Sequence, residues 1–382
     1  MDNTEVTELI QELVRIETEN PPGNELKCAE YIHGWFKEHE IETELIDEPV
    51  EDRPQVVARI GDGDPTLVLN GHTDVVPAGD REKWTYGPYS GTVDNGKIYG
   101  RGAVDMKTGL AIGMLTTRDI GKELERGDSS GSIIFHGAMG EETGDPGTKT
   151  LLEKGYTGEY GVVLEPTGMR VATATKGTAW YTITVSGEPS HASRPDQGTN
   201  AIENANHVIE ALTDYGTDVR SREDELVGTA FATLTEFSAG TKENIVPERA
   251  EITLDRRVLP DERFEDLDEE LNSILEQLAD EHGIETEWKQ YQIYEPSLTP
   301  EESRVTDVFR RNVAELTDVP TEPWGIPAAT DTRDLINSAE MDAITWGPGD
   351  ISQAHTFDEY IYEQEAVDGL HVLKQAAREL LQ

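Results

Sequence analysis

The sequence LVLNGHTDVVP, which runs from Leu67 to Pro77, joins an apolar run to a histidine and an aspartate. The run predicts a buried strand, and His72 comes just past its carboxyl end, the edge at which ligands of α/β sheets gather. Asp74 could accept a hydrogen bond from the second ring nitrogen of His72 and so fix its tautomer and orientation. Taken alone, the segment is better explained as a loop histidine beside a turn aspartate, so a functional site needs support from the rest of the chain.

Apolar runs alternate with amphipathic segments around this stretch. Strands are expected at 56–60, 66–70, 132–139, 161–164 and 343–346, and helices at 106–124 and 363–381. Strands that alternate with helices predict an α/β fold in which a mostly parallel sheet is flanked by helices.

The middle of the chain has a different order of elements. Strands are expected at 179–186, 230–236, 250–258 and 285–291, and helices at 200–212 and 264–281. This β-α-β-β-α-β order is that of a ferredoxin-like α+β unit. Because 382 residues exceed what one core usually spans, we expect two domains. Residues 1–175 and 293–382 would form the α/β domain, and 176–292 an inserted one.

The charge balance of the chain is strongly acidic. Asp and Glu total 77 against 32 Lys and Arg, which gives a formal net charge of −45. Such a surface repels nucleic acid and anionic membranes, because phosphate binding needs clustered cations. It also repels itself unless salt screens it, so the composition resembles that of proteins from halophilic, salt-accumulating microbes. A disordered acidic chain is the alternative, and the regular apolar segments argue against it.

The sequence predicts neither secretion nor a membrane anchor. No run approaches the roughly 18 apolar residues that a transmembrane helix needs, and the acidic start at Met1 is unlike a signal peptide. The one cysteine, Cys28, excludes an intrachain disulfide and fits a reducing compartment. We therefore expect a soluble cytoplasmic protein.

Histidine is the most informative residue type here, because carboxylates are abundant and histidine occurs only nine times. Four further segments resemble the one that contains His72, because each places polar side chains after an apolar run or at the start of a helix. They contribute Asp105, Glu141, Glu142, Glu165 and His355. Taken singly, Asp105 or His355 could equally be a helix cap or a loop residue. Together these side chains could converge above the sheet, and such a mixed set suits zinc, cobalt or manganese better than magnesium.

Five segments resemble the signatures of the M20 metallopeptidase family. They are GHTDVVP (71–77), GRGAVDMK (100–107), EETG (141–144), EP (165–166) and AHT (354–356), in the family's order over nearly the whole chain. The family includes acetylornithine deacetylases, succinyl-diaminopimelate desuccinylases, carboxypeptidase G-type enzymes and aminoacylases. The resemblance implies a two-metal α/β catalytic domain with an inserted ferredoxin-like lid and dimerisation domain.

The resemblance also implies how the metal ligands are shared. Asp105 would bridge two divalent ions, with zinc the first expectation and cobalt or manganese the next. His72 and Glu165 would hold one ion, and Glu142 and His355 the other. Two such ions, roughly 3.5–4 Å apart, would use these five ligands.

Three residues are expected to carry the catalysis. Glu141 would be the general base that takes a proton from the metal-bridging water, so that hydroxide attacks the substrate carbonyl. Asp74 would orient His72. His191, within GEPSHASRP (187–195), resembles a lid histidine that stabilises the oxyanion, often from the partner subunit.

Three residues match positions that bind substrate in the family, two within the inserted segment and one after it. They are Asn244, Arg257 and, more weakly, Thr330. The guanidinium of Arg257 suits a substrate carboxylate, although this side chain could instead neutralise the nearby Asp255.

The first hypothesis is a metal-dependent amidohydrolase that removes the acyl group of an N-acyl amino acid, as acetylornithine deacetylases and desuccinylases do. A dipeptidase or carboxypeptidase with the same two-metal centre is the alternative, and the metal ligands do not decide between them. A non-catalytic binding protein should have lost a ligand or the base, and neither is missing. The resemblance implies a homodimer through the inserted domain, with a monomer as the alternative, and the acyl group stays open.

Overall fold

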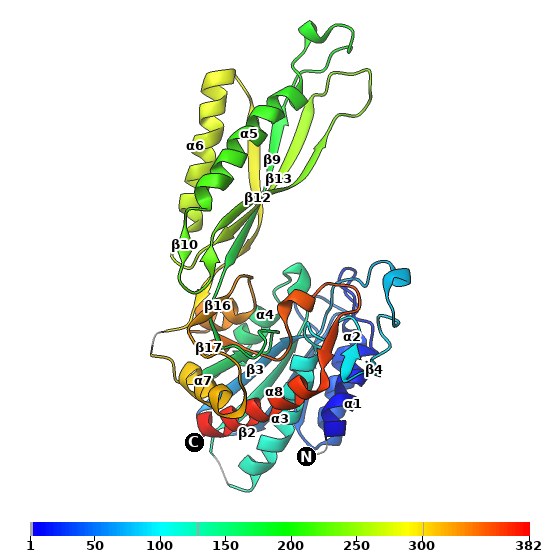
Figure 1. Cartoon of the computed structure of the whole chain (residues 1–382), viewed down its shortest axis with the longest axis vertical. Coiled ribbons are helices and arrows are strands. Elements are labelled where there is room, and N and C mark those ends of the chain that lie inside the picture. Colours follow the sequence, from blue (N-terminus) through cyan, green and yellow to red (C-terminus); the bar gives the residue numbers. More distant parts are fainter. Residues whose placement is uncertain (1–2, 128–129, 301) are drawn as a thin grey trace. The chain divides into compact units, whose positions relative to one another are not determined.

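The strand that ends in His72 lies near the middle of a mixed sheet (Figure 1). In the computed structural model, which describes residues 3–127, 130–300 and 302–382, this strand is β3 (Thr66–His72). It pairs in parallel with β6 (Ser132–Ala138) and β7 (Tyr160–Val163), and β7 pairs in parallel with β17 (Asp342–Thr345). The carboxyl ends of these four strands therefore meet at one edge of the sheet.

Antiparallel strands extend this sheet on both sides. β2 (Gln55–Gly61) pairs with β6, β1 (Glu42–Ile46) pairs with β2, and β8 (Ala172–Thr175) pairs with β17. Two short strands, β15 (Ser297–Leu298) and β16 (Trp324–Ile326), complete it beside β8. The predicted α/β fold, a mostly parallel sheet flanked by helices, is confirmed for the central strands, and antiparallel strands were not predicted at the edges.

Both faces of β3 are buried because helices cover both sides of the sheet. Since successive side chains of a strand point to opposite faces, Leu67 and Leu69 join one hydrophobic cluster and Val68 joins another. The first cluster includes residues of α1 (Asn3–Val14), α2 (Leu26–Glu38), α3 (Lys107–Glu125), α7 (Arg304–Leu316) and α8 (Glu363–Leu380). The second includes residues of α4 (Gly147–Glu153).

A separate three-stranded sheet supports two of the loops that carry predicted ligands. It has the order β18-β5-β4, formed by β4 (Thr92–Asp94), β5 (Lys97–Tyr99) and β18 (Tyr360–Tyr362). Tyr360 pairs with Tyr99 in this sheet, so the segment after His355 lies beside the segment that leads to Asp105.

The chain forms two compact units, of which the second contains Thr175–Ser297 and Pro327–Ala329. This second unit has a four-stranded antiparallel sheet of order β12-β13-β9-β14 and two long helices. In chain order its elements are β9 (Gly177–Ser186), α5 (Ala201–Val219), β12 (Phe231–Ala239), β13 (Arg249–Val258), α6 (Phe264–His282) and β14 (Thr286–Tyr294), with a hairpin of β10 (Glu223–Asp224) and β11 (Gly228–Thr229) before β12. This is the predicted β-α-β-β-α-β order.

Alternating burial explains this second sheet. Tyr181, Ile183 and Val185 of β9 are buried, while the residues between them are half-buried. Buried positions on α5 and α6 recur at helical spacing, for example Leu267, Leu271, Leu275 and Leu278. In the described part of the chain, no helix is both long enough and apolar enough to cross a membrane.

Candidate metal centre

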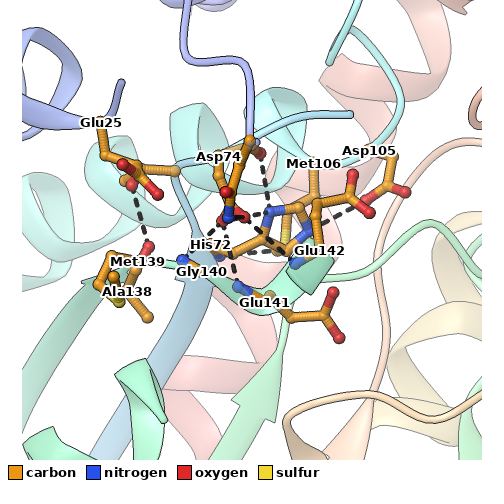
Figure 2. Close-up of polar contacts among 12 residues, drawn as sticks. Glu25, His72, Asp74, Asp105, Met106, Ala138, Met139, Gly140, Glu141 and Glu142 are labelled. Atoms are coloured by element: carbon orange, nitrogen blue, oxygen red, sulfur yellow. Dashed lines mark hydrogen bonds and ion pairs between the residues drawn. The ribbon is translucent and has the colours of Figure 1, made fainter. Parts of the chain in front are cut away.

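His72 is the last residue of β3 and is almost completely buried, with 2% of its surface exposed. Figure 2 shows its ring among the loops that carry Asp74, Asp105 and Glu142. Its Nε2 lies 3.0 Å from Oδ1 of Asp105 and 3.6 Å from Oε1 of Glu165. Its Nδ1 lies 2.9 Å from the main-chain oxygen of Asp74. Because a carbonyl oxygen only accepts hydrogen bonds, Nδ1 carries a proton, and in the neutral ring Nε2 would be the nitrogen that can bind a metal ion.

Asp74 faces His72, as the sequence suggests, and also supports a second part of the site. Its carboxylate oxygen Oδ1 lies 3.5 Å from Nδ1 of His72, farther than its own main-chain oxygen. The carboxylate also accepts hydrogen bonds from the backbone N–H groups of Gly140, Glu141 and Glu142, at 3.0, 3.3 and 3.2 Å. Asp74 therefore orients His72 through its backbone and holds the carboxylate pair through its side chain.

Asp105 lies between the two candidate histidine ligands. Its Oδ1 faces His72, and its Oδ2 lies 3.3 Å from Nε2 of His355. The same nitrogen of His355 is 3.1 Å from Oε2 of Glu142. A carboxylate that presents one oxygen to each of two ligand sets has the arrangement required of a bridge between two metal ions.

The remaining carboxylates complete two overlapping groups. One ligand atom from each of His72, Glu141 and Glu165 lies within 4.8 Å of the others, and the same holds for His72, Asp105 and Glu142. The structure therefore brings together all six residues that the sequence singled out at the strand ends. Distances alone do not separate the proposed base, Glu141, from the proposed ligands.

The electrostatics of the cluster favour a bound cation. Burial raises the pKa of Glu141 to about 8, and burial together with the charge of Asp105 raises the pKa of Glu165 well above its ordinary value. Hydrogen bonds to Asp105 and Glu142 raise the pKa of His355 to about 10. The carboxylates thus lack solvent and repel one another, a conflict that divalent ions would relieve. Two imidazoles with several carboxylates are a donor set that fits zinc, cobalt or manganese.

Two functional candidates were missed by sequence reasoning. The buried carboxylate of Glu359 accepts hydrogen bonds from the backbone N–H groups of Val104 and Asp105. Asn20 donates from its side-chain amide to the carboxylate of Asp74. Neither residue has a distinguishing sequence signal, because acidic residues are abundant and Asn20 reads as part of a proline-rich turn.

Thr330 is buried, and its hydroxyl contacts the hydroxyls of Thr332 and Thr345 at 3.1 and 3.2 Å. The next residue lies closer to the chemistry: the charge of Asp331 contributes to the raised pKa of Glu141, after burial. Asp331 is held by a 2.6 Å hydrogen bond from the hydroxyl of Thr148. The segment predicted to bind substrate therefore lies near enough to Glu141 for the charge of Asp331 to affect its pKa.

In the second unit, His191 and Asn244 lie next to each other in two exposed loops. The N–H of Ala192 donates to the main-chain oxygen of Asn244 at 3.1 Å, and His191 forms an isolated bridge with Ile245. The backbone N–H of Ser193 donates to Nδ1 of His191 at 3.1 Å. Because Nδ1 accepts, a neutral His191 carries its proton on Nε2, the form that can donate to an oxyanion.

Arg257, on β13 of the second unit, is engaged by its neighbour. Its Nε and Nη2 donate to the two carboxylate oxygens of Asp255 at 2.8 and 3.0 Å, and its Nη1 donates to Thr178 at 3.2 Å. Residues two apart on a strand share a face, so this pairing follows from the register. A substrate carboxylate would have to compete with Asp255 for this guanidinium.

An α/β sheet whose parallel strands end in a histidine and carboxylate cluster is an arrangement that fits a metal-dependent hydrolase. The sequence model of peptidase family M20/M25/M40 matches residues 68–379. The chain belongs to this family and is a hydrolase of amide bonds.

Individual relatives agree with this assignment. A probable succinyl-diaminopimelate desuccinylase from Staphylococcus aureus is 27% identical, over 98% of this chain and 97% of the relative. An M20 family metallo-carboxypeptidase from Sulfolobus solfataricus shares the fold, with a TM-score of 0.81, 18% identity and 99% of each chain covered. A dinuclear metal-binding M20 peptidase from Bacillus subtilis also shares it, with a TM-score of 0.71, 17% identity, and 99% of this chain and 98% of that chain covered.

Proposed function

We propose that this hydrolase removes the acyl group from an N-acyl amino acid, in the manner of acetylornithine deacetylases and succinyl-diaminopimelate desuccinylases. The observation that carries the proposal is the position of Asp105, with one carboxylate oxygen toward His72 and the other toward His355. The desuccinylase relative, which aligns over nearly the full length of both chains, supports the substrate class.

The proposed centre holds two divalent ions. His72 and Glu165 would bind one, Glu142 and His355 the other, and Asp105 both. Zinc is the first candidate, with cobalt and manganese as alternatives, because all three accept mixed imidazole and carboxylate ligands. Bound here, the ions would lower the pKa of a water molecule and polarise the substrate carbonyl.

Glu141 is the proposed general base. It follows Gly140 in a turn whose backbone N–H groups donate to Asp74. These hydrogen bonds fix the position of the Glu141 backbone, and so restrict where its carboxylate can lie beside the cluster. Glu141 takes one proton from water as the oxygen adds to the amide carbon, and returns it to the nitrogen as the C–N bond breaks. The products are the free amino acid and the carboxylic acid of the acyl group. A protonated carboxyl is the form needed for the second step.

The second unit would supply the substrate-side groups. The Nε2–H of His191 would donate to the oxyanion, and Asn244, which lies beside it, would contact the substrate. Arg257 would bind the substrate's α-carboxylate by exchanging Asp255 for it. Thr330 is buried, so it would act on substrate binding indirectly, by holding the segment that contains Asp331.

The proposal includes a homodimer formed through the second unit. β12 is an edge strand of its sheet, and edge strands present unpaired N–H and C=O groups that can pair with another chain. Phe237 on this strand is 50% exposed, and Ile245 in the following loop is 42% exposed. Light scattering of wild type and Phe237→Glu would test this interface, with dimer and monomer masses as the respective expectations.

The experiment that tests the activity is hydrolysis of a substrate panel by the metal-loaded protein in high salt. The panel contains N-acetyl-ornithine, N-succinyl-diaminopimelate, other N-acetyl amino acids and simple dipeptides. Turnover of an acylated amino acid that a chelator abolishes and added zinc restores would support the proposal. Turnover of dipeptides alone would overturn the deacylase assignment in favour of a peptidase.

A further inference from the structure

The loop after His355 is fastened at its far end to the loop that carries Asp105. One carboxylate oxygen of Glu359, Oε1, accepts from the backbone N–H of Val104 at 2.8 Å and from that of Asp105 at 3.2 Å. The main-chain oxygen of Glu359 accepts from the N–H of Gly100 at 2.9 Å. Glu359 therefore contacts both ends of the segment from Gly100 to Asp105.

The other carboxylate oxygen has a separate partner. Oε2 of Glu359 lies 2.5 Å from Nη1 of Arg101, and both side chains are buried. The guanidinium of Arg101 also lies over the ring of Trp84, 5.3 Å from its centroid. The two oxygens thus have different partners. Oε1 accepts the backbone N–H groups of Val104 and Asp105, and Oε2 pairs with the guanidinium of Arg101.

We propose that Glu359 is a positioning residue that fixes Asp105 relative to His355 and so sets the geometry of the bridging ligand. The inference rests on the proposed metal-binding roles of Asp105 and His355. Glu359 is four residues from His355 in the same loop, and it accepts the backbone N–H of Asp105 itself. A shift of Glu359 would therefore change the position of Asp105 relative to His355. Its side chain bonds the backbone of Val104 and Asp105 and the guanidinium of Arg101.

A purely stabilising role is the competing explanation. Any buried carboxylate that accepts a backbone N–H and pairs with an arginine contributes to stability, and its loss leaves those donors unsatisfied. A positioning role makes a further demand: the reach of the side chain to the two N–H groups should matter more than its charge. The two properties can be separated by substitution.

Three variants separate reach from charge. Glu359→Asp keeps the charge but is one methylene shorter, so the bonds to Val104 and Asp105 are lost or lengthened. Glu359→Gln combined with Arg101→Met keeps the acceptor Oε1 at full reach and removes both charges. Glu262→Asp is the matched control in the second unit, since Glu262 also accepts a backbone N–H, from Leu259 at 2.9 Å, and pairs with Arg256.

The measurement is the binding of cobalt(II) chloride to metal-free protein in high salt, followed by calorimetry and by the visible absorption of the bound cobalt. We expect Glu359→Asp to bind at least one of the two ions about 10- to 100-fold more weakly and to change the cobalt spectrum. The Glu359→Gln and Arg101→Met pair should keep the affinity within a few fold, and Glu262→Asp should match wild type. Hydrogen exchange at Val104 and Asp105 should rise only in Glu359→Asp.

Wild-type cobalt affinity and spectrum in Glu359→Asp would overturn the inference, as would a loss of affinity in the charge-free pair alone. The proposed function fails separately. If the wild type binds two ions but cleaves no acylated amino acid, the substrate assignment is wrong, and the ratio of cobalt affinities still decides the role of Glu359.

Discussion

The side-chain amide of Asn20 donates a hydrogen bond to the carboxylate of Asp74 at 2.9 Å, across a separation of 54 residues in the sequence. The same nitrogen donates to the hydroxyl of Thr143 at 2.7 Å. Because the Asp74 carboxylate also accepts from the backbone of Gly140 and Glu142, the N-terminal segment, the loop after β3 and the carboxylate-bearing turn share one hydrogen-bond network. A residue far from the recognisable signatures therefore supports the centre.

Replacing Asn20 should impair the centre more than it impairs the fold. We expect Asn20→Ala to lower kcat/KM about 10- to 100-fold, the range seen when a partner of a ligand-bearing group is removed. Asn20→Asp should be worse, because a second carboxylate would face Asp74. The measurement is steady-state kinetics together with metal content.

Asn312 provides the matched control for this prediction. It is a buried asparagine of α7 whose amide donates to the main-chain oxygen of Val308 at 2.9 Å and to the side chain of Glu379, in α8, at 3.0 Å. Asn312→Ala should reduce stability without changing kcat/KM of the protein that remains folded. Equal effects of Asn20→Ala and Asn312→Ala on kcat/KM would show that Asn20 is only structural.

Glu141→Gln should separate catalysis from metal binding. As the proposed base, Glu141 should be dispensable for holding the ions, so this variant should keep two ions per chain while kcat falls about 10²- to 10⁴-fold. Glu165→Gln, in a proposed ligand, should lose metal as well as activity. Elemental analysis alongside kinetics makes the comparison. Full turnover by Glu141→Gln with both ions present would mean that another group is the base.

The sequence was most informative where one geometric rule applies. Parallel strands end at a common edge, so side chains that follow β3, β6, β7 and β17 were predicted to converge, and His72, Glu142 and Glu165 do lie together. The second unit was predictable because its two central strands, β9 and β13, alternate between buried and mostly half-buried positions. The proximity of Arg257 and Asp255 was predictable for the same reason, since they are two apart on one strand.

The parts that could not be predicted depend on contacts that leave no periodic pattern of apolar and polar residues in the sequence. Glu359 and Asp74 both act by accepting backbone N–H groups, and any carboxylate among 77 acidic residues could do this. β1 was missed because four of its five residues are at least partly exposed, so it lacks an apolar run. The proposed roles of the ligands and of the lid residues stay predictions, because proximity alone does not assign them.

His136, on β6, should make the protein sensitive to acid. Burial lowers the pKa of this side chain to about 3, whereas an unfolded histidine titrates near 6.5. Between these values the unfolded chain binds a proton that the folded chain does not, so stability falls as the pH is lowered from about 6.5 toward 3. The loss attributable to this residue is at most about 1.4 kcal/mol per pH unit.

Comparison with His136→Gln isolates this contribution, because other titrating groups cancel in the difference. The wild type should lose stability relative to the variant as the pH falls from 6.5 to 4.5, while above pH 7 their difference should be constant. Denaturant unfolding at each pH in high salt gives the two free energies of unfolding. A difference that does not change with pH would show that folded His136 takes up a proton as readily as the unfolded chain.

Salt should stabilise this protein strongly, because its formal net charge is −45. Repulsion among unpaired carboxylates opposes the compact state, and at about 1 M salt the screening length falls to about 3 Å, which removes most of that repulsion. The surface ion pairs that salt also weakens are each worth only about 0–1 kcal/mol, so the net effect should be a gain. For a chain of 382 residues that melts as one unit, each kcal/mol gained should raise the melting midpoint by roughly 1–2 °C. Melting curves in potassium chloride, with an isosmotic sucrose series as the uncharged control, measure this gain. A midpoint in dilute buffer equal to that in molar salt would mean that the acidic side chains are spaced widely enough, or paired locally enough, for the net charge to have little influence on folding.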